Sequence, residues 1–453
     1  MTLASLPTAA ETLASHFMSV RYEDLPVERL NHAKQLIRDY LGVSLGGSRT
    51  ESGKIAALFA QDSAGKELAT IIGNGAKVPA DSAAFANAIA SHSIELDDVD
   101  YLALFHFSPP VVSAAIAVAE AEKTSGKEFL TAVVLGCEMM SRASHAANFS
   151  LRDRGFHTTP TCGVFGAAVA AGFLMKLNPE QMTSALGMAG AQAAGLMEMY
   201  GPSMQKRFNP GPTARNGITA ARMAKLGFTG ASTIFEGERG FLKSFTLEHD
   251  VSALTNKLGY DFPNEFEYKA YSCARPIHNA IDCALNIRQQ MNVATSKVTA
   301  ITMRRHPKWA HYHQNSKPKT YHEAQVSLSY SVAVALTDGA ALFPQYKNER
   351  LNDPELLRLA GMVEFVPDSS LPRGVSCLME LTIDDGRSYK SQVDYPKGSI
   401  QNPMSEDEMC GKVHMLGDPV VGADRVDKMI VEVANLENSI SIEAIMTAVG
   451  TPA

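Results

Sequence analysis

The sequence predicts a mainly α-helical protein with a smaller α+β domain, arranged as a large all-helical domain that carries an inserted α+β lid domain. Two observations lead to this prediction. Apolar residues recur at helical spacing in one segment after another of the first half, whereas alternating, β-branched stretches appear after about residue 267. The length of 453 residues also exceeds what one hydrophobic core usually serves, so at least two domains are expected.

The helical part begins with a clear pattern at residues 26–47. Apolar residues such as Leu30, Ala33 and Ile37 recur at helical spacing, and a Gly-Gly pair ends the run. Further helices are expected at residues 82–92, 111–125, 128–147, 161–176, 179–197 and 211–226. Many of them are rich in Ala and Gly, whose small side chains let helices approach closely. We therefore expect them in the centre of a bundle.

The lid is predicted from a change of pattern. Residues 297–306 alternate and are β-branched, which is typical of a strand. Residues 377–395 contain two strand-like runs on either side of Asp385-Gly386, a strong hairpin pattern. Between these two segments, residues 323–339 have the spacing of a helix. Strands and helices together indicate an α+β unit.

The chain is then expected to return to the first domain. Residues 398–405 resemble a return loop, with Pro403 near the start of another helix, and the tail is also helical. We therefore predict a discontinuous helical domain of residues 1–266 and 398–453, and a lid domain of residues 267–397.

Composition excludes several classes of protein. The net charge of −7 argues against nucleic acid or an anionic membrane as a partner, because phosphate binding needs surplus Lys and Arg. The six cysteines are scattered, which is typical neither of a disulfide framework nor of a metal clip and suits a reducing cytoplasm. The amino terminus shows no signal-peptide pattern. We expect a cytoplasmic protein.

The segment 91–115 gathers ionisable side chains between two apolar helices. They are His92, Glu95, Asp97, Asp98, Asp100 and His106. A solvated acidic loop explains any one of these carboxylates, but a cluster between buried helices is costly unless paired and often marks a site. Asp97 with His106 forms a plausible carboxylate–imidazole pair. A divalent metal is the alternative, yet no His-x-x-x-His or Glu-x-x-His spacing supports it, so no metal is predicted.

Two further segments suggest an anion site in the helical domain. His157 precedes an apolar helix whose N–H groups suit a carboxylate ligand, although a capping loop with an incidental His fits equally well. Lys206 and Arg207 lie in a Gly/Pro-rich turn, where adjacent cations hold anions and a Lys with a lowered pKa acts as a base. An ordinary surface basic pair is the alternative.

The proposed domain junction and the lid add four candidates. Lys269, Arg275 and His278 lie in the junction segment 267–285, where a loop must present at least one of them. Tyr330 lies on the otherwise apolar helix of the lid. A core Tyr is the default at such a position, and a phenol that donates a proton is the alternative.

Six strings, taken together, resemble the successive signature blocks of the MmgE/PrpD family. They are HSIELDDVD, GFHTTPTCGVFGAA, SMQKRFNPGPTARNGITAARMAKLGFTG, FEGERGF, KAYSCARPIHNAID and EAQVSLSYSVAVAL. They occur in order between residues 92 and 336, and the resemblance extends from about residue 30 to 405, so it covers nearly the whole chain. The family includes 2-methylcitrate dehydratase, cis-aconitate decarboxylase and iminodisuccinate epimerase. The resemblance implies a cleft between a helical domain and a lid, no cofactor, and a homodimer.

The resemblance also assigns roles to individual residues. It implies catalytic positions at Asp97, His106, His157, Lys206, Lys269 and Tyr330. His278 matches a histidine that is common after the junction, and we add His92, Arg207 and Arg275 as candidates for binding a small anionic di- or tricarboxylate.

Two departures from the family pattern bear on the reaction. Relatives of the decarboxylase type carry a second histidine five residues after the junction lysine, where this chain has Ala274. Dehydratases of the methylcitrate type have a Trp-rich stretch and a His-Pro-Ser block, where this chain reads LALFHFSPP. Removal of a proton next to a carboxylate is common to the dehydratase and epimerase reactions, which we expect first. A decarboxylase, a metal-dependent hydro-lyase and a non-catalytic helical scaffold are the alternatives.

Overall fold

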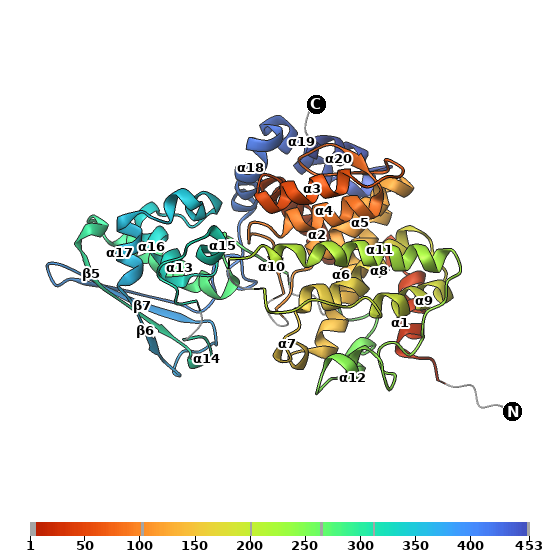
Figure 1. Cartoon of the computed structure of the whole chain (residues 1–453), viewed down its shortest axis with the longest axis horizontal. Coiled ribbons are helices and arrows are strands. Elements are labelled where there is room, and N and C mark those ends of the chain that lie inside the picture. Colours follow the sequence, from red (N-terminus) through yellow and green to blue (C-terminus); the bar gives the residue numbers. More distant parts are fainter. Residues whose placement is uncertain (1–5, 101–103, 200–201, 263–265, 311–312, 451–453) are drawn as a thin grey trace.

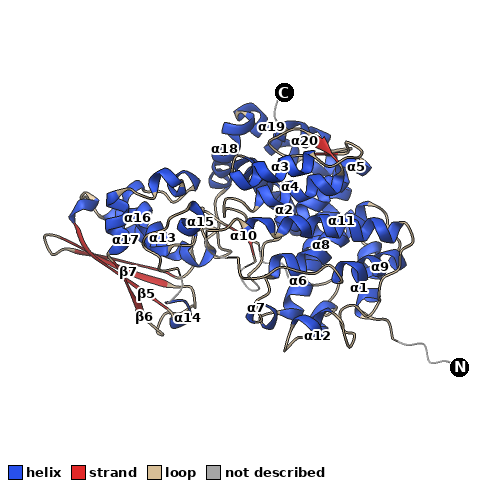
Figure 2. Ribbon diagram, in the orientation of Figure 1, coloured by secondary structure: helices blue, strands red, loops and turns tan. Residues whose placement is uncertain are grey.

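The computed structural model describes residues 6–100, 104–199, 202–262, 266–310 and 313–450. It has two lobes, a large helical one and a smaller one that contains a sheet (Figures 1 and 2). A mainly α-helical protein with a smaller α+β domain is therefore confirmed.

The large lobe is built around helices that are buried on most sides. Its helices are α1 (Ala9–Ser19), α2 (Val27–Ser48), α3 (Glu51–Gln61), α4 (Ala80–Ser91), α5 (Ser108–Glu122), α6 (Gly126–Ala147), α7 (Ser150–Asp153), α8 (Thr158–Leu174), α9 (Pro179–Gly190), α10 (Gln205–Phe208), α11 (Pro210–Lys225) and α12 (Phe241–Phe245). The central helix α8 is buried along almost its whole length, as expected for a helix that is apolar all round. It packs against α5, α6 and α11.

Glycines make this close packing possible, as the Ala- and Gly-rich segments predicted. At Gly217 in α11, a Cβ atom would lie 2.5 Å from Cβ of Ala167 in α8 and 2.8 Å from its main chain. Such contacts are too short for any side chain, so the two helices approach at the distance that glycine sets.

The lid is a four-stranded sheet with helices on one face (Figure 1). Its strands are β5 (Val298–Arg305), β6 (Val363–Pro367), β7 (Cys377–Ile383) and β8 (Ser388–Val393), in the order β6-β5-β7-β8. Strand β6 pairs with β5 in parallel, and the other two pairings are antiparallel. Its helices are α13 (His278–Gln290), α14 (Pro307–Ala310), α15 (Tyr321–Gln325), α16 (Leu328–Asp338) and α17 (Pro354–Gly361). A separate apolar cluster forms its core.

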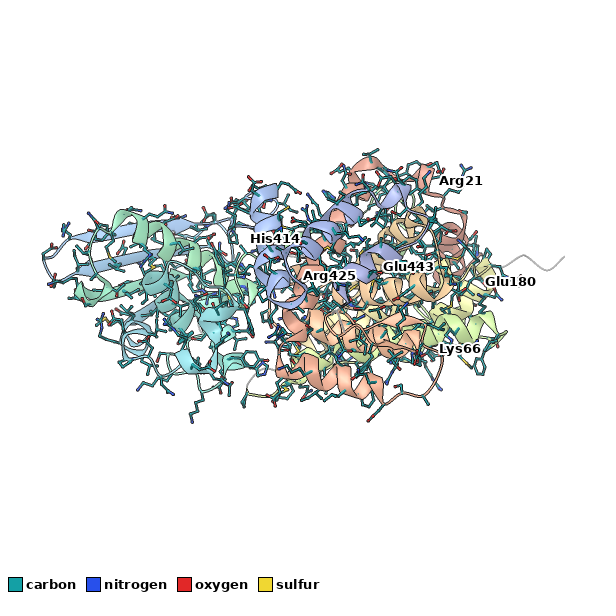
Figure 3. The ribbon with its side chains drawn as sticks, turned by 90° about the horizontal axis from the view of Figure 1, so that it is seen from above. Arg21, Lys66, Glu180, His414, Arg425 and Glu443 are labelled. Atoms are coloured by element: carbon teal, nitrogen blue, oxygen red, sulfur yellow. The ribbon has the colours of Figure 1, made fainter. Side chains whose placement is uncertain are left out.

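The last segment of the chain returns to the helical lobe. Helices α18 (Glu406–Val421), α19 (Ala423–Ala434) and α20 (Glu443–Val449) follow the lid, and α18 packs on α2. Seen from above, His414 marks α18 where it borders the lid (Figure 3). Val413 and Val426 share an apolar cluster with residues of the first lobe. The division at residues 266/267 and 397/398 agrees with these two clusters but stays a prediction.

Two short ladders complete the helical lobe. Strands β1 (Ala69–Thr70) and β2 (Lys77–Val78) form one of them. The other pairs β3 (Asp98–Val99) with β4 (Glu267–Tyr268), and so ties the acidic segment to the domain junction. Gly398 also lies against this junction, because a Cβ there would clash with the carbonyl oxygen of Tyr268.

Most predicted elements are present with shifted ends, but the helix expected at 323–339 is divided. It becomes α15 and α16, because the side chain of Ser327 accepts a hydrogen bond from the N–H of Tyr330 and starts a new helix. The predicted hairpin forms as β7 and β8, with Gly386 at a φ of 85° in the turn. Within the described part of the chain, no helix is long and apolar enough to cross a membrane.

Gly217→Ala should lower the free energy of unfolding by about 1–3 kcal/mol, because the added methyl group would push α11 away from α8. Gly411→Ala in α18 is the matched control, since a methyl group there would meet no neighbouring element within 4 Å and alanine is the better helix former. Urea unfolding of both variants measures the difference. Equal stability of the two variants would contradict the packing argument.

Candidate active site

The site is centred on Glu95, a buried carboxylate that contacts three cations. Lys206 and Arg207 both donate hydrogen bonds to its Oε1, and Lys269 Nζ lies 2.8 Å from its Oε2. All four side chains are almost completely buried. Burial alone would raise the pKa of Glu95, but the three cations hold it well below its usual value. Glu95 is therefore ionised and links α10 to the domain junction.

Glu95 takes a backbone conformation that non-glycine residues rarely adopt. Its φ is 55°, in the left-handed region. The lid fixes the preceding peptide, because Ser272 Oγ and Gln325 Nε2 both donate to the carbonyl oxygen of Ile94. Gln325 also accepts a hydrogen bond from Arg207 at 3.0 Å. Contacts from both lobes thus hold the carboxylate in place, as is often seen where strain is kept at a functional site.

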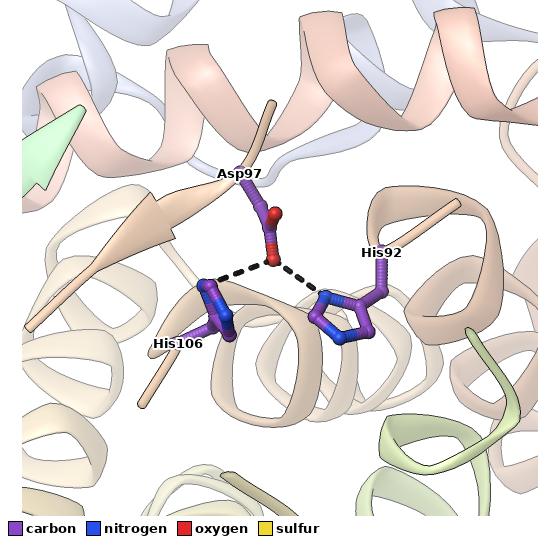
Figure 4. Close-up of side chains that lie close together, drawn as sticks. All are labelled: His92, Asp97 and His106. Carbon is purple, nitrogen blue, oxygen red and sulfur yellow. Dashed lines mark hydrogen bonds and ion pairs between the residues drawn. The ribbon is translucent and has the colours of Figure 1, made fainter. Parts of the chain in front are cut away.

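Asp97 lies between two histidines, as Figure 4 shows. His92 Nδ1 donates to Asp97 Oδ2 at 2.6 Å, and His106 Nδ1 lies 3.3 Å from the same oxygen. Lys269 approaches the other oxygen at 3.3 Å. Burial would raise the pKa of Asp97, but His106, Lys269 and His92 together hold it well below its usual value. The predicted Asp97–His106 pair is present, and His92 shares the carboxylate.

The tautomer of His106 follows from its partners. Nδ1 contacts the main-chain carbonyl oxygen of Asp98, which only accepts, so Nδ1 carries the proton. Burial lowers the pKa of His106 to about 3 in spite of the Asp97 carboxylate, so the ring is neutral at neutral pH. Nε2 then holds a lone pair. Because His106 lines the pocket, it has the form of a general base.

His157 has the opposite tautomer. Its Nδ1 accepts a hydrogen bond from Asn209 Nδ2 at 3.0 Å, so in the neutral ring Nε2 carries the proton. Burial lowers the pKa of His157 well below its usual value, and nearby His92 and Lys206 lower it further. His157 also lines the pocket, where it can donate a hydrogen bond.

The acidic segment is fixed at the start of α5. Asp98 accepts hydrogen bonds from the N–H groups of Phe107 and Ser108 at 2.7 and 3.0 Å. Its burial, together with the neighbouring Asp97, raises its pKa to about 7. Thr159 at the start of α8 accepts from the N–H of His106 at 3.1 Å. Contacts at the starts of α5 and α8 therefore fix the orientation of the His106 imidazole.

The inner pocket, of about 70 Å³, lies between the two lobes. It is lined by Glu95, Val99, Leu104, His106, Arg152, His157, Lys206, Lys269, Ala274, Arg275, Pro276, Trp309 and His313. An adjoining outer cavity of about 860 Å³ shares Leu104, Arg152, Trp309 and His313 with it. The helical lobe supplies both pocket histidines that the sequence predicted, and the lid supplies the opposite wall.

The predicted site residues separate into three groups. Lining the pocket are His106, His157, Lys206, Lys269 and Arg275. Behind it, Asp97 contacts His106, His92 contacts Asp97, and Arg207 donates to the pocket residue Glu95. His278 also lies behind, where its Nδ1 is 3.1 Å from Arg275, and Arg275 pairs with Glu267 at 2.7 Å.

Tyr330 is the predicted residue that the structure does not bring to the site. It is fully buried in the core of the lid, and its hydroxyl donates to the carbonyl oxygen of Gln345 at 3.0 Å. The default interpretation of this position, a core Tyr with a satisfied hydroxyl, accounts for these contacts.

Sequence reasoning assigned no role to Glu95, Arg152 or His313. Glu95 was one of several carboxylates in its segment, and only the fold shows that three cations meet there. Arg152 lies only five residues before the candidate His157, and this closeness in the sequence could have indicated that it belongs to the same site. His313 lies on the lid wall, where burial lowers its pKa to about 4.

His92, Asp97 and His106 also have the side-chain types that bind metals, and one ligand atom from each lies within 4.8 Å of the others. The donor set nevertheless disfavours a metal. Both imidazoles turn a protonated Nδ1 towards Asp97, and the Lys269 ammonium contacts the same carboxylate. That no metal binds here stays a prediction.

Glu95→Gln should lower the free energy of unfolding by about 3–5 kcal/mol at pH 7, because three buried cations lose their shared counter-charge. Since the pKa of Glu95 is depressed, its contribution is present above the usual value of 4.5 and is lost as the pH falls through the folded-state pKa. The difference between wild type and variant should therefore shrink below about pH 4.5.

Urea unfolding at several pH values measures this difference. Glu23→Gln, which removes an exposed partner of Lys127, is the control and should match the wild type. A constant difference down to pH 3 would contradict the assigned charge state of Glu95.

Comparison with known proteins agrees with the resemblance found in the sequence. Residues 11–254 match the model of the MmgE/PrpD N-terminal domain, and residues 271–438 match that of the MmgE/PrpD C-terminal domain. The chain is 26% identical to the "Cis-aconitate decarboxylase-like protein oryM" of Aspergillus oryzae, over 96% of each protein. It is 26% identical to the cis-aconitate decarboxylase of Homo sapiens, over 96% of this chain and 92% of the relative. The corresponding protein of Aspergillus terreus is 27% identical, over 95% of this chain and 93% of the relative. The chain therefore belongs to the MmgE/PrpD family.

Proposed function

We propose that this protein is an enzyme that removes a proton from the carbon next to a carboxylate of a small di- or tricarboxylate, and then eliminates water or inverts that carbon. One observation carries the proposal. A neutral imidazole, His106, lines a pocket whose walls hold several cations, and its Nδ1 is bound elsewhere, which leaves Nε2 as the proton acceptor. A base facing cations is what abstraction of a weakly acidic C–H proton requires.

The first step transfers the proton to Nε2 of His106. The C–H electron pair moves into the carboxylate and forms an enediolate, whose charge needs donors already in place. Lys206, Lys269 and the Nε2–H of His157 line the pocket and serve as those donors. Asp97 stabilises the imidazolium that forms on His106.

The second step decides the reaction class. If the adjacent carbon carries a hydroxyl group, the enediolate expels it, and a proton from Lys206 completes a molecule of water. If no leaving group is present, Lys206 returns a proton to the opposite face and the carbon is inverted. Lys206 suits both roles, because burial lowers its pKa to about 8 in spite of the adjacent Glu95.

Decarboxylation is the second candidate, and the relatives support it. They are named cis-aconitate decarboxylase or a protein like it, and they align over 95–96% of this chain. Ala274 weighs against this reaction, since its methyl group lines the pocket where relatives of the decarboxylase type are expected to carry a histidine. The homodimer and the cytoplasmic location implied above stay predictions.

Proton NMR in deuterated buffer tests the proposal directly. The panel comprises 2-methylcitrate, citrate, cis-aconitate and the stereoisomers of iminodisuccinate. Deuterium entering one substrate identifies carbon-acid chemistry, and loss of water, inversion or loss of carbon dioxide identifies the class. No exchange in any member, with folded protein, would reject the proposal for these acids and favour the non-catalytic alternative.

The activity found in that panel should fall as the pH rises above about 8. Lys206 then loses the proton that makes it a cation and a proton donor. Lys206→Ala should reduce kcat by roughly 100- to 1,000-fold, as for other groups that stabilise a developing oxyanion.

The matched control is Lys225→Ala at the end of α11, whose side chain is half exposed. It should keep wild-type rates and the same fall above pH 8. A wild-type profile that stays flat to pH 10 would contradict the role of Lys206.

A further inference from the structure

Most cations in and directly behind the inner pocket already have a carboxylate partner. Lys206, Arg207 and Lys269 share Glu95, and Lys269 also contacts Asp97. Arg275 pairs with Glu267 on the lid side. These charges hold the site together, so only part of their field is left for a ligand.

Arg152 differs from these cations. It lies on α7, is half-buried, and its Nη1 is 3.7 Å from the sulfur of Met197. Among the residues that the structure describes, no carboxylate lies within ion-pair distance of its guanidinium. The neighbouring Asp153 lines the outer cavity but not the inner pocket. A guanidinium without a carboxylate at a cavity wall is suited to bind one from a ligand.

The position of Arg152 gives it a particular part of the ligand. It lines both the inner pocket and the outer cavity, so it lies where the two meet. Lys206 and Lys269 line only the inner pocket. A substrate whose reacting end lies beside His106 and these lysines would therefore extend its other end towards Arg152. The large outer cavity leaves that end room to enter.

We propose that Arg152 binds a second, distal carboxylate of the substrate and makes the site selective for acids that carry one. The proposal rests on the proposed function for the location of the reacting end. Arg152 forms a two-pronged ion pair with the distal group, while the reacting carboxylate stays with Lys206 and Lys269. Acids without the distal group lose this contact and bind more weakly.

Binding of two unreactive acids tests the proposal without any turnover. Tricarballylate has three carboxylates, and isobutyrate is the same molecule with both terminal carboxylates replaced by hydrogen, so it has no distal group. Isothermal titration calorimetry of the full chain should show tighter binding of tricarballylate. Arg152→Gln should weaken binding of tricarballylate by roughly 10- to 100-fold, as expected for the loss of a charged hydrogen-bonded pair, and change binding of isobutyrate less than about twofold. Arg152→Lys should give an intermediate affinity.

Arg154→Gln is the matched control, because Arg154 is exposed two residues away and donates to the carbonyl oxygen of Ser244. It should leave both affinities unchanged. Equal weakening of both acids in Arg152→Gln, no weakening of either, or no binding of tricarballylate to the wild type would overturn the proposal. Selective weakening without deuterium exchange in the NMR panel would keep the subsite and reject only the proposed reaction.

Discussion

The burial of Glu95 with three cations is the interaction on which the rest of the site depends. Burying any one of these four charges without its partners would cost several kcal/mol. The elements that carry them must therefore come together in the folded protein. Glu95 comes from the segment before β3, Lys206 and Arg207 from α10, and Lys269 from the junction after β4. The pairing of β3 with β4 sets Lys269 beside Glu95. The charges therefore join the two lobes at the place where the pocket forms.

The same cluster sets the protonation states that chemistry needs. Burial keeps the pocket histidines neutral, while Glu95 stays ionised beside three cations and Asp97 stays ionised beside Lys269 and two imidazole N–H groups. Fixed partners then give His106 and His157 opposite tautomers. One fold thus supplies a proton acceptor and a hydrogen-bond donor from the same residue type, as sites that combine acid and base roles require.

The returning segment supports this arrangement from behind. Lys412 of α18 lies 2.6 Å from Asp39 of α2 and donates to the carbonyl oxygen of Leu96 at 2.7 Å. Leu96 lies between Glu95 and Asp97, so a buried ion pair from two distant helices holds the peptide that carries both carboxylates. This contact gives a physical reason why the chain returns to the helical lobe after the lid.

Periodicity predicted the helices and the hairpin because these elements depend on local patterns. It did not predict the parallel strand β6, which depends on pairing with the distant β5, or the division of the lid helix at Ser327.

The ionisable segments were found because charge between apolar helices is unusual. The roles of individual residues were harder to assign. In the sequence Glu95 is one acidic residue among several, and only the fold brings three cations into contact with it. Tyr330 shows the converse, a residue in a matching string whose hydroxyl is satisfied within the lid core.

The distribution of groups between the two pocket walls bears on which reaction the site favours. The helical lobe contributes His106, His157 and Lys206, whereas the lid contributes Ala274, Trp309 and His313 among others. Decarboxylation leaves a carbanion where carbon dioxide departs, and a proton donor must stand at that point. The methyl group of Ala274 cannot supply that proton. Elimination and inversion need only a proton taken by one group and returned by another, and in the proposed reaction His106 and Lys206, both from the helical lobe, are that pair. In the proposed reaction, the helical wall therefore holds both groups for proton transfer, and the lid wall differs from it by offering Ala274 where a further proton donor would stand.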